Sequence, residues 1–261
     1  MSETAPPSVA ARFRLDGRVA VVTGASKGIG EAIARALAEA GARVVVSSRK
    51  QEAVDKVAHA IGAAGGEAIA LAANVGRPGE AEALAARAIA HWGGIDVVVN
   101  NAAANPVFGP VLDTDDAVFD KILAVNVKGP LALCRAAHAS MRARGAGSVV
   151  NVSSIGGISP EPGLGLYSVS KAALVSLTQV LAQEWGPDGI RANVVCPGLI
   201  KTRFSQALWG DERLLAHTLA QQPLKRIGVP DDVAGLALFL ASDAAAYCTG
   251  GVYMVDGGYL T

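Results

Sequence analysis

Apolar residues are grouped into short, nearly continuous runs that alternate with longer amphipathic segments. The runs rich in β-branched residues cover residues 19–23, 43–48, 68–73, 96–100, 148–153, 191–196 and 251–256. Between them lie alanine-rich segments with helical spacing, such as GEAIARALAEAG and EAEALAARAIAHW. Continuous apolar strands separated by helices indicate a parallel sheet covered on both faces. The pattern therefore predicts a doubly wound α/β fold.

The domain organisation follows from the same alternation. No internal repeat or linker rich in Pro, Gly and Ser divides the 261 residues, so we expect one domain over residues 14–261. Residues 1–13, MSETAPPSVAARF, lack the apolar segment of a secretory signal and are expected to form a loose tail. Residues 199–228 interrupt the alternation after a strand, where such sheets place a substrate lid.

Composition narrows the possible functions. The chain is 51% hydrophobic and has 23 basic and 23 acidic residues, so its net charge indicates neither nucleic acid nor an anionic membrane as a partner. No stretch approaches the roughly 18 apolar residues of a membrane span. Cys134, Cys196 and Cys248 are widely spaced, which favours a reducing cytosol over a disulfide framework or a zinc site. We expect no metal.

A glycine-rich segment follows the first predicted strand. In TGASKGIG, residues 23–30, Gly24, Gly28 and Gly30 lie between a strand and a helix. Glycine lets the backbone turn sharply and approach a pyrophosphate, and the helix N-terminus supplies free N–H groups. A plain strand–helix turn would use glycines in the same way. The glycines therefore indicate a dinucleotide site only because they lie between a predicted strand and a predicted helix.

The ends of the next strands suggest which dinucleotide binds. An acid after the second strand usually binds a ribose without a phosphate, but this chain has Ser48 and Arg49 there, with Lys27 in the glycine segment. A hydroxyl and two cations suit a 2′-phosphate, which favours NADP over NAD. The alternative is that Arg49 is a solvated surface charge. Asn74, after the third strand, can bond adenine or simply form a turn.

A tyrosine and a lysine share one face of a predicted helix. Tyr167 and Lys171 are four residues apart in LYSVSKAAL, and Tyr167 comes thirteen residues after Ser154 at a strand end. A nearby ammonium favours phenolate, so Lys171 is expected to lower the tyrosine pKa from its ordinary value near 10. A serine hydroxyl can hold a substrate oxygen that gains charge. A Tyr-x3-Lys pair alone would be weak evidence, because such pairs also arise by chance on helices.

Together these segments resemble the short-chain dehydrogenase/reductase family. The resemblance runs from TGASKGIG through NNAA, NVSS and YSVSK to CPGLIKT and VDGG, essentially the whole chain. It implies a single-domain Rossmann fold with seven parallel strands and a bound nicotinamide cofactor. It also implies a homotetramer built from the helices around 115–143 and 165–185 and from the C-terminal strand.

The resemblance assigns roles to particular residues. It implies that Tyr167 is the general acid in reduction and the base in oxidation, that Ser154 orients the carbonyl, and that Lys171 holds the nicotinamide ribose. Asn126, in AVNVKG, matches an asparagine that anchors a proton-relaying water. The expected cofactor-binding residues are Gly24, Ser26, Lys27, Gly28, Ile29, Gly30, Ser48, Arg49, Asn74, Val75, Asn100, Ala102, Tyr167, Lys171, Pro197, Gly198, Ile200 and Thr202.

Three positions depart from the family pattern. Ala103 replaces the glycine of NNAG, and its methyl group is expected to tighten the cofactor cleft. Asn74 replaces an aspartate, which changes the donors and acceptors offered to adenine. The chain ends in GYLT rather than a Ser-Lys-Leu peroxisome signal, so we expect a cytoplasmic protein.

The predicted activity is NADP-dependent interconversion of a ketone or aldehyde with an alcohol. The substrate is expected to be small to medium in size and rather apolar, with Ser154, Phe108, Leu164, Phe204, Leu208 and Trp209 as binding residues. The alternatives are an NAD-linked dehydrogenase of a sugar acid, steroid or polyol, and a 3-oxoacyl reductase. A catalytically silent dinucleotide sensor is a further alternative, because fold does not fix function.

Overall fold

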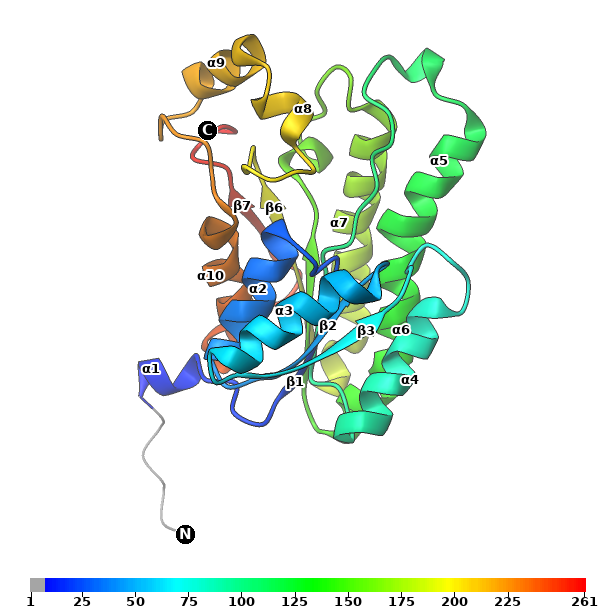
Figure 1. The fold of residues 1–261 in the computed structure, drawn as a ribbon, viewed down its shortest axis with the longest axis vertical. Helices are drawn as coiled ribbons and strands as arrows, with labels where there is room; N and C mark the ends of the chain where they lie inside the picture. Colours follow the sequence, from blue (N-terminus) through cyan, green and yellow to red (C-terminus); the bar gives the residue numbers. More distant parts are fainter. Residues whose placement is uncertain (1–7) are drawn as a thin grey trace.

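The computed structural model describes residues 8–261, which are built around one sheet of seven parallel strands (Figure 1). The strand order is β3-β2-β1-β4-β5-β6-β7, and each neighbouring pair is parallel. The strands are β1 (Val19–Thr23), β2 (Arg43–Ser48), β3 (Glu67–Ala72), β4 (Val97–Asn100), β5 (Gly147–Val152), β6 (Ile190–Pro197) and β7 (Val252–Val255). This order confirms the predicted doubly wound sheet. The chain adds strands outward in one direction from β1 to β3 and in the other direction from β4 to β7, so the topological switch point lies between β1 and β4.

Helices cover both faces of the sheet (Figure 1). The longer ones are α2 (Gly28–Glu39), α3 (Gln51–Ala63), α4 (Glu80–Trp92), α5 (Asp116–Leu123), α6 (Gly129–Ala143), α7 (Gly165–Trp185), α9 (Glu212–Gln221) and α10 (Pro230–Ala241). Two short helices are α1 (Val9–Arg12) and α8 (Gln206–Trp209). Single turns of 3₁₀ helix lie at Val111–Asp113, Ile155–Gly157, Gly186–Asp188 and Asp243–Ala245.

The two layers of helices explain why the strands are apolar without alternation. Val22 and Val46 belong to a core cluster that includes side chains of α2, α3 and α10. Their neighbours Val21 and Val45 belong to a second cluster with side chains of α4, α6 and α7. Successive strand residues point to opposite faces, and both faces of the central strands are buried, so most of their residues are apolar and the polar ones, such as Asn100 and Asn151, are hydrogen-bonded to each other.

The predicted elements match the structure closely, with one interruption. The first two strands have the expected bounds, and each end of the other five lies within one residue of its expected position. The helix expected at 165–185 is α7, whereas the region 115–143 contains two helices joined by a π turn at Ala124–Lys128. Pro130 has no N–H to donate to the carbonyl four residues earlier, at Asn126, which suits a wider turn at this place.

The structure also locates the expected tail and the expected lid. Residues 1–7 of the tail lie outside the described residues, and residues 9–12 form α1. The next residue, Phe13, packs with its ring centroid 6.1 Å from that of Phe239. Residues 199–228 contain α8 and α9, beyond the carboxyl end of β6 (Figure 1). Within residues 8–261, no helix is long and apolar enough to cross a membrane.

The close approach of α2 to the β4 end gives a stability prediction. A methyl group added at Gly30 would overlap the Asn101 amide nitrogen and come within 2.6 Å of the Gly24 carbonyl oxygen. We expect Gly30→Ala to lower the free energy of unfolding by about 1–3 kcal/mol, as overpacking does. Urea denaturation measures the change. Gly235→Ala is the control, because it adds a methyl group in α10 with no atom within 4 Å; an equal loss in both variants would contradict the packing argument.

Candidate functional site

The carboxyl ends of the strands open into one large cavity. Its volume is about 1560 Å³, and it extends from the loop between β1 and α2, past the ends of β2 to β5, to the start of α7 and the segment with α8 and α9. Parallel strands bring these loops to the same edge of the sheet, beside the point where the strand order reverses. The fold therefore joins the glycine segment and the Tyr–Lys pair in a single site.

The glycine segment is held tightly against the end of β4. Gly24 and Gly28 have φ angles of 65° and 62°, which favour glycine. A methyl group at Gly24 would lie 2.8 Å from the Cα of Ala102, so this turn has no room for a side chain. Lys27 precedes α2 without a side-chain cap, so the first N–H groups of the helix remain available to a ligand.

The outer end of the cavity carries the expected cations. Ser48, Arg49 and Lys27 line it together with Asn74 and Val75. Within residues 8–261, neither Arg49 nor Lys27 forms an ion pair. The side-chain oxygen of Asn74 accepts a hydrogen bond from the Gly76 N–H at 3.2 Å, which leaves its NH₂ group as the donor for a ligand.

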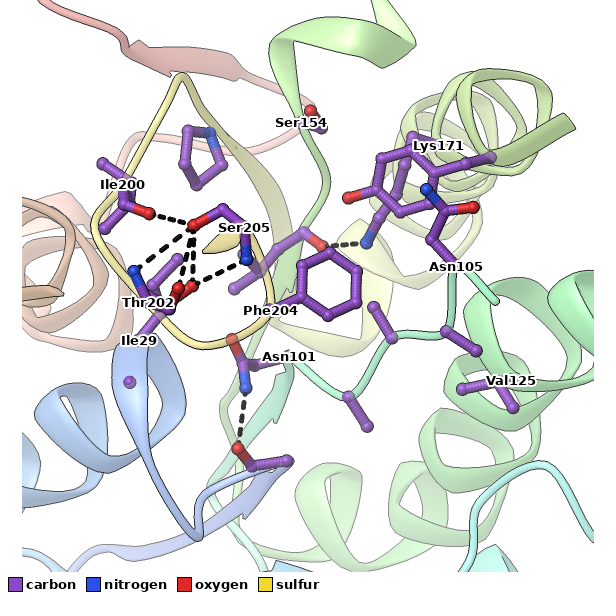
Figure 2. Close-up of a pocket in the computed structure, with 18 of the residues that line it drawn as sticks. Ile29, Asn101, Asn105, Val125, Ser154, Lys171, Ile200, Thr202, Phe204 and Ser205 are labelled. Atoms are coloured by element: carbon purple, nitrogen blue, oxygen red, sulfur yellow. Dashed lines mark hydrogen bonds between the residues drawn. The ribbon is translucent and has the colours of Figure 1, made fainter. Parts of the chain in front are cut away.

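Tyr167 and Lys171 lie at the opposite end, in the first turns of α7. Figure 2 shows Lys171 there. Their exposed fractions are only 9% and 2%. Lys171 Nζ donates to the carbonyl of Val152, at the end of β5, at 2.8 Å, and it lies 5.6 Å from the Tyr167 ring centroid. The helix thus places a phenol and an ammonium side by side over the end of the sheet.

Burial shifts the pKa values of this pair in opposite directions. It raises the pKa of Tyr167 above its ordinary value, and the Ser154 hydroxyl opposes that rise. It lowers the pKa of Lys171 to about 8, because an ammonium loses its hydration in the interior. The direction of the Tyr167 pKa shift is therefore opposite to the expected lowering, because loss of hydration is the largest effect on the phenol.

Asn126 lies behind the cavity wall rather than in the cavity. Its side-chain oxygen accepts the Ala104 N–H at 2.8 Å, and its amide donates to the Ala104 carbonyl at 3.0 Å and to Ser170 Oγ at 2.9 Å. Ser170 Oγ in turn donates to the Tyr167 carbonyl at 2.6 Å. Asn126 therefore connects the loop after β4 to the helix turn that carries the tyrosine.

Ser154 lies two residues after the end of β5 and lines the cavity. Its backbone is extended, with φ at −167°, and its Oγ accepts the Gly156 N–H at 3.1 Å. The hydroxyl proton is not used in that contact, so it remains able to donate to a ligand oxygen. Ser154, Tyr167 and Lys171 all line the cavity, and Figure 2 shows Ser154 and Lys171.

The segment after β6 closes another side of the cavity. Pro197, Gly198, Ile200 and Thr202 line it as expected. Ser205 Oγ donates to the Ile200 carbonyl at 2.5 Å and lies 3.0 Å from Thr202 Oγ1, which folds the segment into a compact turn (Figure 2). This turn places Phe204 with its ring centroid 6.1 Å from that of Tyr167.

Three expected ligand-binding residues lie outside the cavity lining. Asn100 is buried and donates to Asn151 Oδ1 at 2.9 Å, Gly30 packs against Asn101, and Trp209 donates to the Thr202 carbonyl at 2.7 Å. Asn100 and Trp209 thus have protein partners for their polar groups, and Gly30 serves close packing. The other expected cofactor and substrate residues line the cavity: Gly24, Ser26, Lys27, Gly28, Ile29, Ser48, Arg49, Asn74, Val75, Ala102, Phe108, Ser154, Leu164, Tyr167, Lys171, Pro197, Gly198, Ile200, Thr202, Phe204 and Leu208.

Sequence reasoning missed lining residues that carry no motif. They include Asn105, Ile155, Glu161, Leu214, His217 and Tyr259. Asn105 could have been found from its place after the fourth strand, and Leu214 and His217 from the expected lid. Glu161 and Tyr259 had no such signal. Within residues 8–261, no group of three or more His, Cys, Asp or Glu residues could hold a metal ion.

Comparison with known proteins identifies the family. The family model described as enoyl-(acyl carrier protein) reductase matches residues 24–260. The chain is 46% identical to dehydrogenase/reductase SDR family member 4 of Sus scrofa, over 97% of this chain and 91% of that protein. The chain therefore belongs to the short-chain dehydrogenase/reductase (SDR) family, and it is an NAD(P)-dependent oxidoreductase acting on CH–OH groups.

Solved structures of relatives share the fold. A gluconate 5-dehydrogenase from Burkholderia cenocepacia J2315, in complex with NADP and tartrate, is 32% identical with a TM-score of 0.93, over 97% of this chain and 99% of that one. A 7α-hydroxysteroid dehydrogenase, complexed with NADH and 7-oxo glycochenodeoxycholic acid, is 34% identical with a TM-score of 0.92, over 95% and 96%. The fold thus occurs with either cofactor and with different substrates.

The buried ammonium predicts a pH dependence of stability. Lys171 has a pKa of about 8 in the folded protein against an ordinary 10.5, so the unfolded chain binds more protons between these values and stability rises with pH there. We expect the free energy of unfolding of the natural chain to rise relative to Lys171→Met by about 2–3 kcal/mol over this interval. Urea denaturation at several pH values tests it; a difference that is independent of pH would contradict it.

Proposed function

We propose that the chain interconverts a ketone or aldehyde with an alcohol using NADP(H), with Tyr167 as general acid in reduction and general base in oxidation. The observation that carries the proposal is the shared cavity: Tyr167, Lys171 and Ser154 line one end, and the glycine segment before α2 lines the other. A long cavity with phosphate-binding features at one end and proton donors at the other suits a dinucleotide and a small substrate together.

The residues present fit a dinucleotide. The turn at Gly24 has no room for a side chain, and the uncapped start of α2 offers N–H groups to a pyrophosphate. Asn74 and Val75 would hold the adenine side, and Pro197, Gly198, Ile200 and Thr202 the nicotinamide side. When bound, the cofactor supplies hydride transfer, and the protein supplies orientation and protons.

The proton steps are assigned to four residues. Ser154 would donate a hydrogen bond to the carbonyl oxygen and hold it beside the Tyr167 phenol, which delivers the proton. When Lys171 is protonated, its ammonium is the neighbouring cation that opposes the rise that burial causes in the Tyr167 pKa. Asn126 holds the loop after β4 and the helix turn of Tyr167 together through Ala104 and Ser170. Asn126 is also the proposed anchor of a water that relays protons.

The preference for NADP rests on charge. Arg49 and Lys27 line the outer end of the cavity beside Ser48, and the described part of the chain provides neither cation with an ion-pair partner. A 2′-phosphate would provide one, and arginine can bind it through two parallel hydrogen bonds. The alternative is an NAD-linked dehydrogenase of a sugar acid, steroid or polyol; the NADH complex of the steroid dehydrogenase relative keeps it open.

The substrate is proposed to be small to medium and mainly apolar. Phe108, Leu164, Phe204 and Leu208 line the cavity and would form its apolar walls, and the ring centroid of Phe204 lies 6.1 Å from that of Tyr167. Trp209 is no longer a proposed wall, because its indole binds the Thr202 carbonyl and its side chain lies outside the lining.

The proposed assembly is a homotetramer in a reducing compartment such as the cytoplasm. Val169 and Val180 on α7 are 50% and 43% exposed and lie on one face of the helix, which suits a helix–helix contact between subunits. Cys134, Cys196 and Cys248 are free thiols, which suits a reducing compartment. Light scattering on the purified protein checks the number of subunits.

Removal of the phenol hydroxyl tests the chemistry. We expect Tyr167→Phe to lower the rate of NADPH-dependent reduction by about 10²–10⁴-fold, because the variant keeps the ring but has no proton to deliver. Initial rates against a panel of ketones, aldehydes, α-diketones and 3-oxoacyl esters measure the loss, and NADPH fluorescence checks that the cofactor still binds. Full turnover by the variant would exclude Tyr167 as the proton donor. Tight binding of cofactor without turnover by the natural chain would favour the sensor alternative.

Reversal of charge at Arg49 tests cofactor choice. We expect Arg49→Asp to lower kcat/KM for NADPH by about 10–100-fold, since a hydrogen bond between charged groups contributes about 1.5–3 kcal/mol. The value for NADH should change far less. Arg87→Asp is the matched control, because it makes the same charge change on the exposed side of α4, outside the cavity. Higher kcat/KM with NADH than with NADPH in the natural chain would favour the NAD-linked alternative.

A further inference from the structure

The lid, residues 199–228, begins and ends at one place. Ile200 forms an isolated parallel bridge with Gly228, and it is buried, with an exposed fraction of 4%. The Lys201 N–H donates to the Gly228 carbonyl at 2.8 Å, and the Gly228 N–H donates to the Leu199 carbonyl at 3.1 Å. The two ends of the lid are therefore fixed to each other, and the position of its middle part is set by contacts beyond this base.

A compact turn, Thr202 to Ser205, directly follows the base (Figure 2). Ser205 Oγ donates to the Ile200 carbonyl at 2.5 Å and lies 3.0 Å from Thr202 Oγ1. The Ser205 carbonyl accepts the backbone N–H of Trp209 at 3.3 Å, across the residues of α8. One serine therefore joins the turn to the base on one side and to α8 on the other.

The Trp209 indole ties α8 back to the turn. Its Nε1 donates to the Thr202 carbonyl at 2.7 Å, and Lys201 Nζ lies 5.5 Å from its ring centroid. The indole lies outside the cavity lining, so it is not a wall for a ligand. Because α8 is only four residues long, its own backbone hydrogen bonds do little to hold it in place. The indole thus provides a side-chain contact that keeps α8 and the turn together.

The turn faces the cofactor side of the cavity with one residue and the substrate side with another. A methyl group added at Gly28 would lie 3.3 Å from Thr202 Cγ2, so Thr202 lies against the glycine segment. The Phe204 ring centroid lies 6.1 Å from that of Tyr167, and Phe204 is 54% exposed. Both Thr202 and Phe204 line the cavity. The position of this single turn therefore sets two surfaces of the site.

We infer that Trp209 is a positioning residue for both ligands: its hydrogen bond to the Thr202 carbonyl holds the turn with Thr202 beside the glycine segment and Phe204 beside Tyr167. A ligand that meets a surface already in place loses less free energy to ordering that surface, so it binds more tightly. The inference rests on the proposed function, which places the nicotinamide beside Thr202. It adds a residue that acts through the turn rather than by touching a ligand.

Two ligands separate the nicotinamide end of the cavity from the rest. The molecule 2′-phospho-ADP-ribose is NADP without its nicotinamide, and calorimetric titration gives the Kd of this molecule and of NADPH. We expect Trp209→Phe, which keeps an aromatic ring but has no N–H, to raise the Kd for NADPH by about fivefold, the size of one neutral hydrogen bond. The Kd for 2′-phospho-ADP-ribose should not change.

Trp92→Phe is the matched control for this measurement. Trp92 is also half-buried, but it lies at the end of α4, outside the cavity lining, with its ring centroid 5.1 Å from that of His91. Three results would each overturn the inference: an unchanged Kd for NADPH in Trp209→Phe, an equal rise for both ligands, or the same rise in the control.

Ser205→Ala loosens the same turn through a different contact. It removes the hydroxyl that donates to the Ile200 carbonyl and lies beside Thr202 Oγ1. We expect the same selective loss of NADPH affinity, and the double variant with Trp209→Phe should lose less than the sum, because both changes act on one turn. Urea denaturation shows whether each variant folds, and Ser205→Ala alone decides the role of the turn if Trp209→Phe does not. An unchanged NADPH affinity in Ser205→Ala overturns that role.

Steady-state kinetics give a second readout. When cofactor and substrate are both bound, they hold the turn themselves, and Ser154 and Tyr167 are unaltered. We therefore expect Trp209→Phe to raise KM for the carbonyl substrate and to leave kcat within about twofold of the natural value. A fall in kcat with unchanged KM would overturn the positioning role, because the effect would then lie on the reaction step.

The binding measurements also separate failure of the inference from failure of the proposed function. If the natural chain binds NADPH no more tightly than 2′-phospho-ADP-ribose, the nicotinamide gains nothing beside Thr202, and both proposals fail together. If the natural chain binds NADPH more tightly and Trp209→Phe keeps the whole difference, the proposed function stands and the inference fails.

Discussion

The position of α7 against the sheet depends on a chain of buried hydrogen bonds. Asn100, at the end of β4, donates to Asn151 in β5 at 2.9 Å, and Asn151 donates to Thr178 Oγ1 in α7 at 2.8 Å. A buried amide without a partner costs free energy, so a shift of α7 along the sheet would leave several groups unpaired. The chain of bonds therefore fixes the helix that carries Tyr167 and Lys171, and the geometry of the whole site follows from it.

That constraint has an electrostatic consequence. A helix held this closely to the sheet buries both members of the Tyr–Lys pair, and burial works against the charged form of each. The Val152 carbonyl compensates part of the cost by accepting a hydrogen bond from the ammonium, and Ser154 acts on the phenol in the opposite sense to burial. Burial thus brings the two protonation states of Lys171 closer in free energy near neutral pH, whereas it favours the protonated form of Tyr167, the form that donates a proton.

The sequence predicted those features that local patterns encode. Apolar runs gave the strands to within one residue at each end, and the glycine segment and the Tyr–Lys spacing located both ends of the cavity. Asn100 was assigned to the cofactor by the family resemblance and Trp209 to the substrate by its place in the expected lid. Whether a side chain at a strand or helix end turns inward depends on tertiary partners, here Asn151 and the Thr202 carbonyl. The sign of the Tyr167 shift was wrong for the same reason: spacing reveals a neighbouring charge but not the degree of burial. Residue pairs such as Asn151 and Thr178 are brought together only by the folded chain.

Cations line the cavity at both of its ends. The exposed Lys27 and Arg49 line the outer end beside the glycine segment, and the buried Lys171 lies beside Tyr167 at the other. Charges in a partly enclosed cavity are screened less than charges in open solvent, so the outer pair suits the phosphates of a cofactor, whereas the buried ammonium lies at the proposed site of proton exchange. The cofactor end is formed by the glycine segment and the strand ends, whereas the substrate end is formed largely by loops and the C-terminal turn. Loops can change without disturbing the sheet, which agrees with the occurrence of one fold in a gluconate dehydrogenase and in a steroid dehydrogenase.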